Sequence, residues 1–344
     1  MAADRQSALP TLADVAVEAR VSASTASRAL QGSPRISAVT TSRVRVAARR
    51  LGYQPNRIAR SLRTRSADLV GIVVPDIGIG FYSRVIKGAQ DVLEKTGYHV
   101  LVASTERTEA REHATLRTLS EHRVNGILLA TTGRFDFDLR VPVVFFDNLV
   151  PHAGVANVAR ANKEGMELLV AHLVSHGHSK IGYIGGPATS TSGRERLQGF
   201  AESLGARRLE TPEEYVQLAD AAWSPAGGGS AMTQLLGLRA PPTAIVTSSD
   251  TLALGAMRAA RQAGLRLPND LALVSFDDPA FGELLDPPIT ALACNDWHMG
   301  ELAASLLLHA LDNHAVRQPT EVRTPVELIV RSSCGCSEVL PAPP

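Results

Sequence analysis

Carboxylate, hydroxyl and aromatic side chains recur directly after short apolar stretches between residues 69 and 278. Such stretches predict buried parallel strands, and ligands of open α/β sheets bind beyond the carboxyl ends of the strands. Carboxylates accept hydrogen bonds from hydroxyl groups, while aromatic faces pack on the C–H groups of a ring. The candidates for binding a small polar ligand are therefore Asp76, Phe81, Tyr82, Asp147, Asn148, Ser249, Asp250, Asp277 and Asp278.

Patterns of catalytic sites are weak by comparison. Gly182, Gly185 and Gly186 lie in or after an apolar stretch, but neither a dinucleotide fingerprint nor a P-loop lysine follows them. The sequence has no G-x-S-x-G motif and no persuasive set of nucleophile, base and orienting residue. We therefore expect no enzyme, an expectation that turnover of a bound small molecule would overturn.

Histidines and cysteines offer two further groups to weigh. His172, His176 and His178 have the residue types of a metal site, but Gly177 ends the helix between them and no adjacent carboxylate completes the set. A structural role is expected for these histidines. Cys334 and Cys336 flank Gly335 with no partner pair elsewhere in the sequence, so a zinc site is not expected either. Three cysteines in the whole chain suit a reducing compartment.

Charge is strongly segregated along the 344 residues, although the net charge is only +1. Residues 1–66 hold 12 arginines, no lysine and three acidic residues, which gives +9. Residues 67–344 hold 23 basic and 31 acidic residues, which gives −8. A basic head on an acidic body indicates a polyanionic partner for the head alone.

The basic head has the pattern of three short helices. Thr11 and Asp14 have capping-box spacing before a first helix, Ser22 can cap a second that ends near Leu30, and a third runs from about 37 to 51. Two helices joined by a tight turn, with a third behind them, predict a helix-turn-helix unit. The exposed face of the second helix is expected to carry Ala23, Ser24, Ser27 and Arg28, and the inner face of the third Val39, Val44 and Ala47 or Ala48.

A hinge is expected over residues 56–66, where arginines surround Ile58 and Leu62. A helix of about eight residues is marginal alone in water, so it should fold only against a partner. Its composition suits phosphate contacts plus one apolar wedge.

From Leu69 onward, apolar strands alternate with amphipathic helices, which predicts parallel sheets in an α/β fold. This length is large for one sheet, so we expect two lobes: the first at about 67–160 plus 292–322, the second at about 161–291 plus 323–338, and a disordered tail at 339–344. The expected strands are 69–74, 99–103, 126–130, 143–146, 180–184, 244–247 and 271–276, and the expected helices 82–96, 108–122, 162–176, 194–204, 228–236, 250–263 and 296–312.

Membrane insertion and export are not indicated. The longest apolar runs are only about half a dozen residues, whereas a membrane-spanning helix needs about 20. Residues 1–10 have no apolar core of a secretory signal. A cytoplasmic protein without a membrane partner is therefore expected.

An ordered series of segments resembles the lactose-repressor and galactose-repressor family of bacterial transcriptional regulators. The match extends over nearly the whole chain. No cofactor is expected. The segments that carry it are TLADVAVEARVSASTASRAL (11–30), LGYQPNRIARSL (51–62), LVGIVVPDI (69–77), RVNGILLA (123–130), GHSKIGYIGGP (177–187), RERLQGF (194–200), the run from Pro242 to Asp278 and PVELIVRSS (325–333).

The resemblance implies a helix-turn-helix domain at 1–55, a hinge helix at 56–66 and a two-lobed, periplasmic-binding-protein-like domain. It implies double-stranded operator DNA as the partner, with phosphate contacts, base readout above all by Arg28, and insertion of Leu62 into the minor groove. The DNA-contacting positions that it implies are Thr11, Ser22, Ala23, Ser24, Thr25, Arg28, Asn56, Arg57 and Leu62.

The resemblance also implies a small-molecule effector between the lobes. A sugar is expected first, and a nucleobase is the rival, although Ser190 stands where the purine repressor has an arginine. The other reading of the large domain is a periplasmic-type sugar- or nucleobase-binding protein with no role on DNA. The implied effector-binding residues are Phe81, Tyr82, Asp147, Ser192, Arg196, Trp223, Ser249 and Asp277.

Some positions depart from the family pattern. Arg20 replaces a small residue in the helix-helix turn, so a differently shaped turn is expected there. Ala26 replaces a valine and should thin the core of the head, and Ser249 replaces an asparagine of the sugar site. No leucine-heptad helix follows Arg331, so a homodimer on a palindromic operator is expected rather than a tetramer.

Overall fold

The computed structural model describes residues 10–30, 32–53, 68–131, 137, 139–150, 155–210, 212–219, 223–312 and 320–336. The chain forms two compact units, the first ending at Ala67 and the second beginning at Asp68. The expected hinge at 56–66, with Asn56, Arg57 and Leu62, lies outside the described residues, and so does the tail at 339–344.

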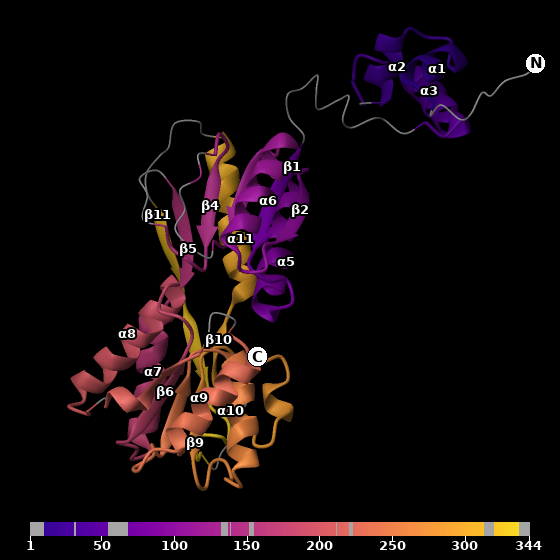
Figure 1. The fold of residues 1–344 in the computed structure, drawn as a ribbon. Coiled ribbons are helices and arrows are strands. Elements are labelled where there is room, and N and C mark those ends of the chain that lie inside the picture. The colour runs from indigo at the N-terminus through magenta and orange to yellow at the C-terminus, as the bar shows by residue number, and fades with distance from the viewer. Residues whose placement is uncertain are drawn as a thin grey trace, which may run out of the picture. The chain divides into compact units, whose positions relative to one another are not determined.

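The described residues of the first unit form three helices, α1 (Leu12–Glu18), α2 (Ala23–Leu30) and α3 (Ala38–Leu51) (Figure 1). The predicted capping box begins α1, since the Thr11 hydroxyl accepts from the Asp14 amide and the Asp14 carboxylate accepts from the Thr11 amide at 2.8 Å. Gly52 ends α3 with a φ of 66°, a left-handed conformation that glycine adopts without strain. Local caps therefore fix where these helices begin and end.

Alanines dominate the small core of this unit, in which Ala26 is fully buried. The predicted inward position of Val39 is wrong, because its side chain is 77% exposed. Val39 precedes the buried Val44 by five positions, which turns it about 140° away around a helix of 3.6 residues per turn. The buried residues are Val15, Ala16, Ala19, Ala26, Ala29, Val44, Ala47 and Ala48.

Arg20 occupies the turn between α1 and α2. The expected change of shape there does not occur, because Arg20 itself adopts a φ of 51° and the Val21 amide donates to the Ala16 carbonyl at 2.9 Å. A left-handed conformation costs a residue with a Cβ about 1–2 kcal/mol. The tight turn is thus retained at the expense of local strain.

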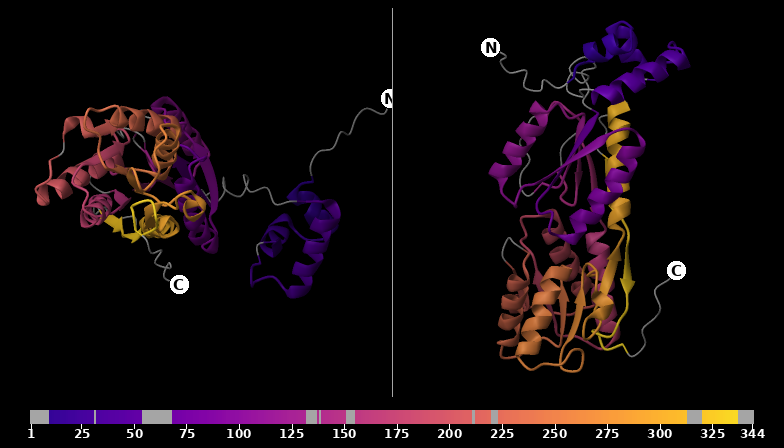
Figure 2. Two further views of the ribbon diagram at one scale, coloured as in Figure 1. Left: turned by 90° about the horizontal axis from the view of Figure 1, so that it is seen from below. Right: turned by 90° about the vertical axis from the view of Figure 1, so that its right-hand side faces the viewer.

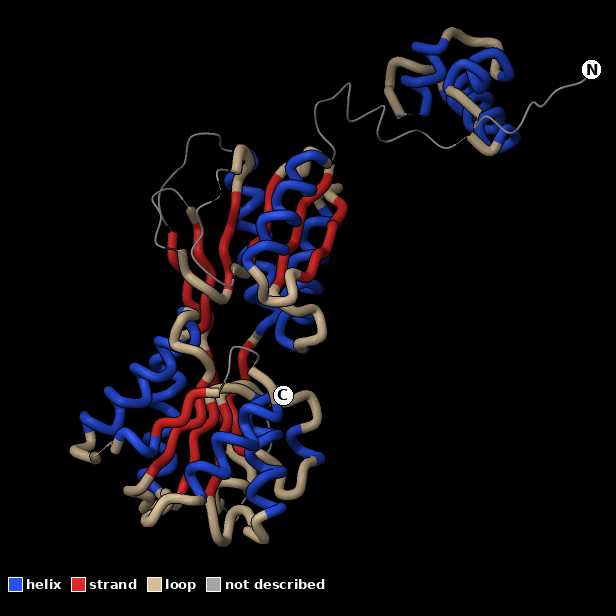
Figure 3. The backbone as a smooth tube through the Cα atoms, in the orientation of Figure 1, coloured by secondary structure: helices blue, strands red, loops and turns tan. Residues whose placement is uncertain are grey.

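Each lobe of the second unit is built on a six-stranded sheet (Figure 3). In the first lobe the strand order is β11-β5-β4-β3-β1-β2, and all pairs are parallel. Helices α5 and α11 cover one face and α6 the other. The elements are β1 (Leu69–Val74), α5 (Gly80–Lys95), β2 (His99–Ser104), α6 (Glu109–Glu121), β3 (Gly126–Leu129), β4 (Val143–Phe146), β5 (Ala156–Arg160), α11 (Asp296–Asp312) and β11 (Thr320–Thr324).

The second lobe has the strand order β12-β10-β9-β8-β6-β7, in which only the β10–β12 pair of the described strands is antiparallel. Helices α7 and α8 pack on one face, and α9 and α10 on the other. The elements are α7 (Asn162–Ser175), β6 (Ile181–Gly185), α8 (Thr191–Ala206), η1 (Glu213–Tyr215), β7 (Val216–Leu218), α9 (Pro225–Leu236), β8 (Ala244–Thr247), α10 (Asp250–Gln262), β9 (Ala272–Ser275), η2 (Gly282–Leu284), β10 (Thr290–Cys294) and β12 (Val326–Ile329).

The chain passes between the lobes three times, after β5, between β10 and α11, and between β11 and β12 (Figures 1 and 2). The expected boundaries at 292 and 322 fall slightly early, because β10 continues in the second sheet to Cys294 and β11 in the first sheet to Thr324. Among the described residues, no helix combines the length and apolarity needed to cross a membrane.

Glycines let α5 and α11 approach closely in the first lobe. A Cβ added at Gly88 would overlap the Trp297 carbonyl oxygen, and one added at Gly300 would overlap the Val85 carbonyl oxygen. Both obstacles are backbone atoms, so relief requires the two helices to separate. The distance between α5 and α11 is therefore set by glycine.

We expect Gly88→Ala to lower the free energy of unfolding of the second unit by about 1–3 kcal/mol, the usual cost of overpacking. Gly205→Ala is the matched control, because Gly205 lies exposed in α8 with nothing near its added Cβ. Alanine is favoured over glycine in a helix by about 0.5–1 kcal/mol, so this variant should be as stable as the wild type or more so. Urea unfolding curves measure both, and equal midpoints for the two variants would contradict the close approach.

Candidate functional site

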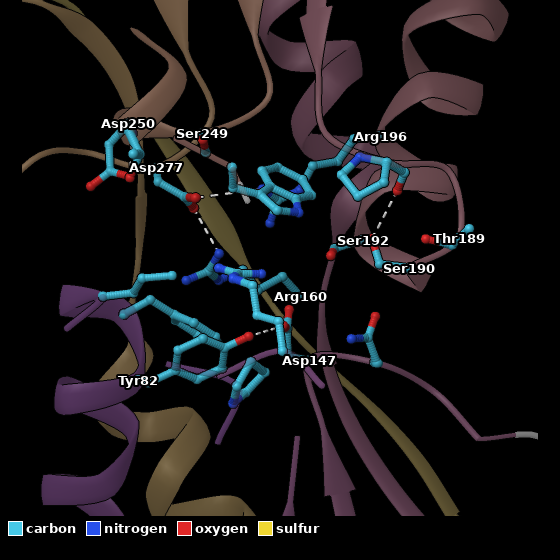
Figure 4. A pocket seen from close by; sticks show the side chains of 18 of the residues that line it. Tyr82, Asp147, Arg160, Thr189, Ser190, Ser192, Arg196, Ser249, Asp250 and Asp277 are labelled. Carbon is cyan, nitrogen blue, oxygen red and sulfur yellow. Dashed lines mark hydrogen bonds and ion pairs between the residues drawn. The ribbon is translucent and has the colours of Figure 1, made fainter. Parts of the chain in front are cut away.

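A cavity between the lobes of the second unit collects all eight effector-binding residues that the sequence predicted (Figure 4). It encloses about 900 Å³, part of which is open to solvent. Its lining includes Phe81, Tyr82, Asp147, Ser192, Arg196, Trp223, Ser249 and Asp277, together with Asn148, Arg160, Ser190 and Asp250.

Strand ends position the two central carboxylates. Asp147 follows β4 with a φ of 67°, and Asp277 comes two residues after β9 with a φ of 75°. Trp223, shortly before α9, has a φ of 48°. Left-handed backbone at residues with a Cβ costs energy and clusters at functional sites. These three strained residues line the cavity, although left-handed backbone also occurs away from it, for example at Asp68 and Arg123.

A buried ion-pair network joins the two lobes at the cavity. Arg160, the last residue of β5 in the first lobe, donates to Asp277 of the second lobe and to Asp296, both at 2.7 Å. Asp277 also contacts Arg196 of α8 at 3.4 Å. Burial disfavours a charged guanidinium, but Asp277 and Asp296 outweigh it and raise the pKa of Arg160. Arg160 therefore keeps its charge inside the protein.

Sequence reasoning missed Arg160, although it obeys the strand-end rule that found Asp147 and Asp277. It stands at the carboxyl end of a parallel strand, but β5 has the sequence ANVAR, whose mixed composition did not mark it as a strand. The available signal was the position of this segment before the helix that begins at Asn162. Recognising β5 would have placed Arg160 among the candidates.

An aromatic ring lies against each of the two guanidinium groups. Arg160 lies over the Phe81 ring with its Cζ 3.9 Å from the centroid, and Arg196 lies over the Phe276 ring at 3.7 Å. Arg196 also donates to the Ser248 carbonyl at 2.6 Å and to the Asn162 side chain at 2.9 Å. These contacts leave the two arginines little freedom to reorient.

Asp147 forms a second polar contact in the cavity. The Tyr82 hydroxyl donates to its carboxylate at 2.9 Å. Burial raises the pKa of Asp147, although Arg160 and Arg196 oppose the effect. Burial, together with the charge of Asp147, raises the pKa of Tyr82. The pair therefore combines a fixed donor with a carboxylate that is costly to ionise.

Two of the hydroxyl groups at the cavity cap helices. The Ser249 hydroxyl caps α10 by accepting from the Leu252 amide at 3.2 Å, and the Ser190 hydroxyl caps α8 by accepting from the Gly193 amide at 3.0 Å. Trp223 lies against Gly186, where an added Cβ would overlap the indole ring. Gly186 thus makes room for the aromatic wall of the cavity.

Two of the initial strand-end candidates have other partners. The Asp278 carboxylate forms a bidentate pair with Arg331 at 2.7 and 2.8 Å, and the Asp76 carboxylate accepts from the Gly78 amide at 2.8 Å. Neither residue lines the cavity that holds the eight predicted residues. Both side chains stabilise local structure instead.

Helix α2 of the first unit presents the predicted DNA-contacting residues. Ala23, Ser24 and Arg28 are exposed, while Ala26 and Ala29 anchor the opposite face in the core. The Ser22 hydroxyl accepts from the Thr25 amide at 3.1 Å and so caps the helix. The exposed face of α2 therefore carries small side chains and one arginine, a combination that suits entry into a major groove.

Asp147→Asn should separate the cost of burying charge from the packing of the cavity. The folded state raises the pKa of Asp147, so the protonated carboxyl group stabilises the folded protein below the usual pKa of an aspartate. This contribution to the free energy of unfolding is lost as the pH rises through the raised pKa. Asparagine stays neutral and can still accept from Tyr82. Urea unfolding should therefore show the variant more stable than the wild type near pH 7 and indistinguishable from it near pH 4. A variant that is less stable at neutral pH would contradict this account.

Comparisons with known proteins agree with the geometry. The model of the family of bacterial regulatory proteins of the lacI type matches residues 11–56, and that of a periplasmic binding protein-like domain matches residues 170–334. The chain is 32% identical to the HTH-type transcriptional repressor CytR of Escherichia coli (strain K12), over 97% of this chain and 98% of that protein. It is 31% identical to the ribose operon repressor of the same strain, over 92% and 98%.

Solved structures give the same result over the full architecture. A lac repressor dimer bound to operator and the anti-inducer ONPF superposes with a TM-score of 0.85 at 28% identity, over 95% of this chain and 99% of that one. A complex of the transcriptional regulator CelR with cellobiose superposes with a TM-score of 0.73 at 30% identity, over 94% and 99%. The chain therefore belongs to the LacI family of DNA-binding transcriptional regulators, whose relatives named here are transcriptional regulators, three of them named as repressors, and not enzymes.

Proposed function

We propose that this chain is a cytoplasmic, homodimeric repressor whose effector is a neutral sugar bound in the cavity between the lobes. The observation that carries the sugar assignment is the pairing of guanidinium and carboxylate groups around a cavity with aromatic walls. Such pairs present donors and acceptors side by side, as neighbouring hydroxyl groups of a sugar require. Phe81 and Trp223 offer apolar faces to its C–H groups.

Charge balance favours a neutral ligand. The lining has four arginines, Arg84, Arg107, Arg160 and Arg196, and three aspartates, Asp147, Asp250 and Asp277. Asp296, which pairs with both Arg84 and Arg160, supplies a fourth negative charge directly behind them. A strongly charged ligand would leave part of this balanced set without compensation, whereas a polyhydroxyl compound adds no charge. The printed names of relatives, a ribose operon repressor and a CelR–cellobiose complex, point to the same class.

Contacts between the lobes provide the means of control. Arg323 of β11 forms a bidentate pair with Glu195 of α8 at 2.6 and 2.7 Å, and the Thr191 amide donates to the Asn148 side chain at 2.8 Å. Together with the Arg160–Asp277 pair, these contacts define one angle between the lobes. A ligand that contacts Asp147 and Asp277 at once would favour one such angle, and the resulting shift of populations would alter the DNA-binding form.

On DNA, α2 would enter the major groove, with Arg28 reading a guanine edge and Ala23 and Ser24 making small contacts. Thr11, Ser22 and Thr25 would lie near phosphates, and the hinge positions Asn56, Arg57 and Leu62 would follow the backbone and minor groove. A two-fold symmetric dimer, like the lac repressor dimer bound to operator, would read a palindromic site.

Arg28→Ala should reduce the preference for the operator over random DNA by about 5- to 150-fold, because one bidentate contact to guanine contributes about 1–3 kcal/mol of discrimination. Arg50→Ala is the control, since Arg50 forms an exposed pair with Glu18 at 2.9 Å across α1 and α3. It should change affinity for both DNAs alike. Titrations of operator and random duplexes over a range of salt concentrations measure both effects, and equal loss of preference in the two variants would overturn the reading role of Arg28.

Trp223→Ala should weaken binding of the effector at least tenfold by removing an aromatic wall of the cavity, while operator binding without effector stays unchanged. Trp297→Ala is the matched control, because Trp297, the other of the two tryptophans, does not line the cavity. Calorimetric screening of neutral pentoses, hexoses and disaccharides identifies the ligand. In Trp297→Phe, only Trp223 remains to report binding by fluorescence. A charged metabolite that binds while every neutral sugar fails would refute the proposal.

A further inference from the structure

Two histidines and two cysteines lie close together in the second lobe, and none of them lines the effector cavity. His172 lies in the last turn of α7, His176 is its C-cap, and Cys334 and Cys336 lie in the segment after β12. One ligand atom from each of the four lies within 4.8 Å of all the others. The Cys336 Sγ is 3.0 Å from the His176 Nε2 and 3.7 Å from the His172 Nε2.

Local structure holds each pair of ligands ready. His172 and His176 are four residues apart on a helix, which places them on one face, and their rings are 4.7 Å apart. Gly335 adopts a φ of 96° between the two cysteines, which turns the chain tightly at this point. Ser333 anchors the turn to the sheet, because its hydroxyl donates to the Leu273 carbonyl at 2.6 Å and accepts from the Thr290 amide at 2.8 Å.

The distances suit a tetrahedral zinc ion. Zinc–sulfur bonds of about 2.3 Å and zinc–nitrogen bonds of about 2.0–2.1 Å place tetrahedral ligand atoms about 3.3–3.8 Å apart. The sulfur–nitrogen distance of 3.7 Å lies within that range and the one of 3.0 Å about 0.3 Å below it, and the 4.8 Å limit needs only a shift of about 1 Å to meet it. Thiolate and imidazole are ligands of zinc, and two thiolates balance its double charge.

A supporting hydrogen bond and the burial of the cluster strengthen the assignment. The Thr290 hydroxyl donates to the Cys334 Sγ at 3.1 Å, as outer residues of metal sites do when they orient a ligand. Cys334 is buried, whereas His176 is exposed, so the cluster extends from the core to the surface and a metal ion can enter from solvent. Apolar packing accounts for the positions of Cys334 and Cys336, but not for the two histidine rings that converge on them.

We propose that His172, His176, Cys334 and Cys336 bind a structural zinc ion that fastens the C-terminal segment to α7. Four protein ligands complete the coordination and leave no open position for substrate, so the site is structural rather than catalytic. The ligand pairs are separated by about 160 residues, and the ion would close this long loop at the edge of the second lobe, beside β12. The separation also explains why the sequence did not reveal the site: each pair alone lacks the other two ligands.

The test is the zinc content of the full-length protein, which is purified under reducing conditions without a metal-affinity tag. Inductively coupled plasma mass spectrometry measures the zinc. The wild type should hold about one zinc ion per chain. Cys336→Ser and His176→Asn should each lose most of it. His178→Asn and Cys294→Ser are matched controls that should retain it, because the His178 ring contacts Thr243 and the Cys294 thiol lies near Asp277.

Cobalt substitution provides a readout that does not depend on the variants folding. Cobalt added to the metal-free wild type should give thiolate charge-transfer absorption and the intense visible bands of tetrahedral coordination, and zinc should displace it. Removal of zinc by a chelator should lower the thermal midpoint of unfolding of the wild type and leave that of Cys336→Ser unchanged. Absence of cobalt spectra, zinc retained equally by all variants, or a Cys334–Cys336 disulfide in the reduced preparation would each overturn the proposal.

Discussion

The buried ion pair between Arg160 and Asp277 is the constraint around which the second unit is arranged. Removing two charges from water costs several kcal/mol per ion, which good geometry and further partners must offset. Asp296, Arg196 and the Phe81 ring supply those partners. Arg160 ends a strand of one lobe and Asp277 follows a strand of the other. The favourable contacts that offset the cost of burial therefore exist only while the two lobes keep this relative position.

The same residues allow a bound ligand to change the relative position of the two lobes. Strained backbone at Asp147, Trp223 and Asp277, and a carboxyl group with a raised pKa at Asp147, are unfavourable features that the packed sheets must offset. A ligand whose hydroxyl groups satisfy these side chains recovers part of that free energy. Binding can therefore shift the population of lobe arrangements, since only an interaction that differs between two states can do so.

Much of the cavity could be predicted because it follows from a rule of topology. Tyr82, Asp147 and Asp277 follow apolar strands, and parallel strands bring their carboxyl ends to one edge. Features that depend on weak or distant signals could not be predicted. Arg160 ends a strand of mixed composition. Val39 is apolar, but it lies on the exposed face of its helix. The cysteine pair meets the histidine pair only in the folded lobe. The expected hinge, with Leu62, lies outside the described residues.

The two units differ in how they gain stability, and this difference bears on regulation. The core of the first unit consists mainly of alanines, which bury little apolar area per residue, and residues 1–66 carry a net charge of +9 that repels itself. Phosphates that neutralise those arginines therefore stabilise the head as well as bind it. Residues 67–344 carry −8 and are repelled by the same phosphates. Segregated charge thus confines DNA binding to the head and leaves the lobes free to respond to a small molecule.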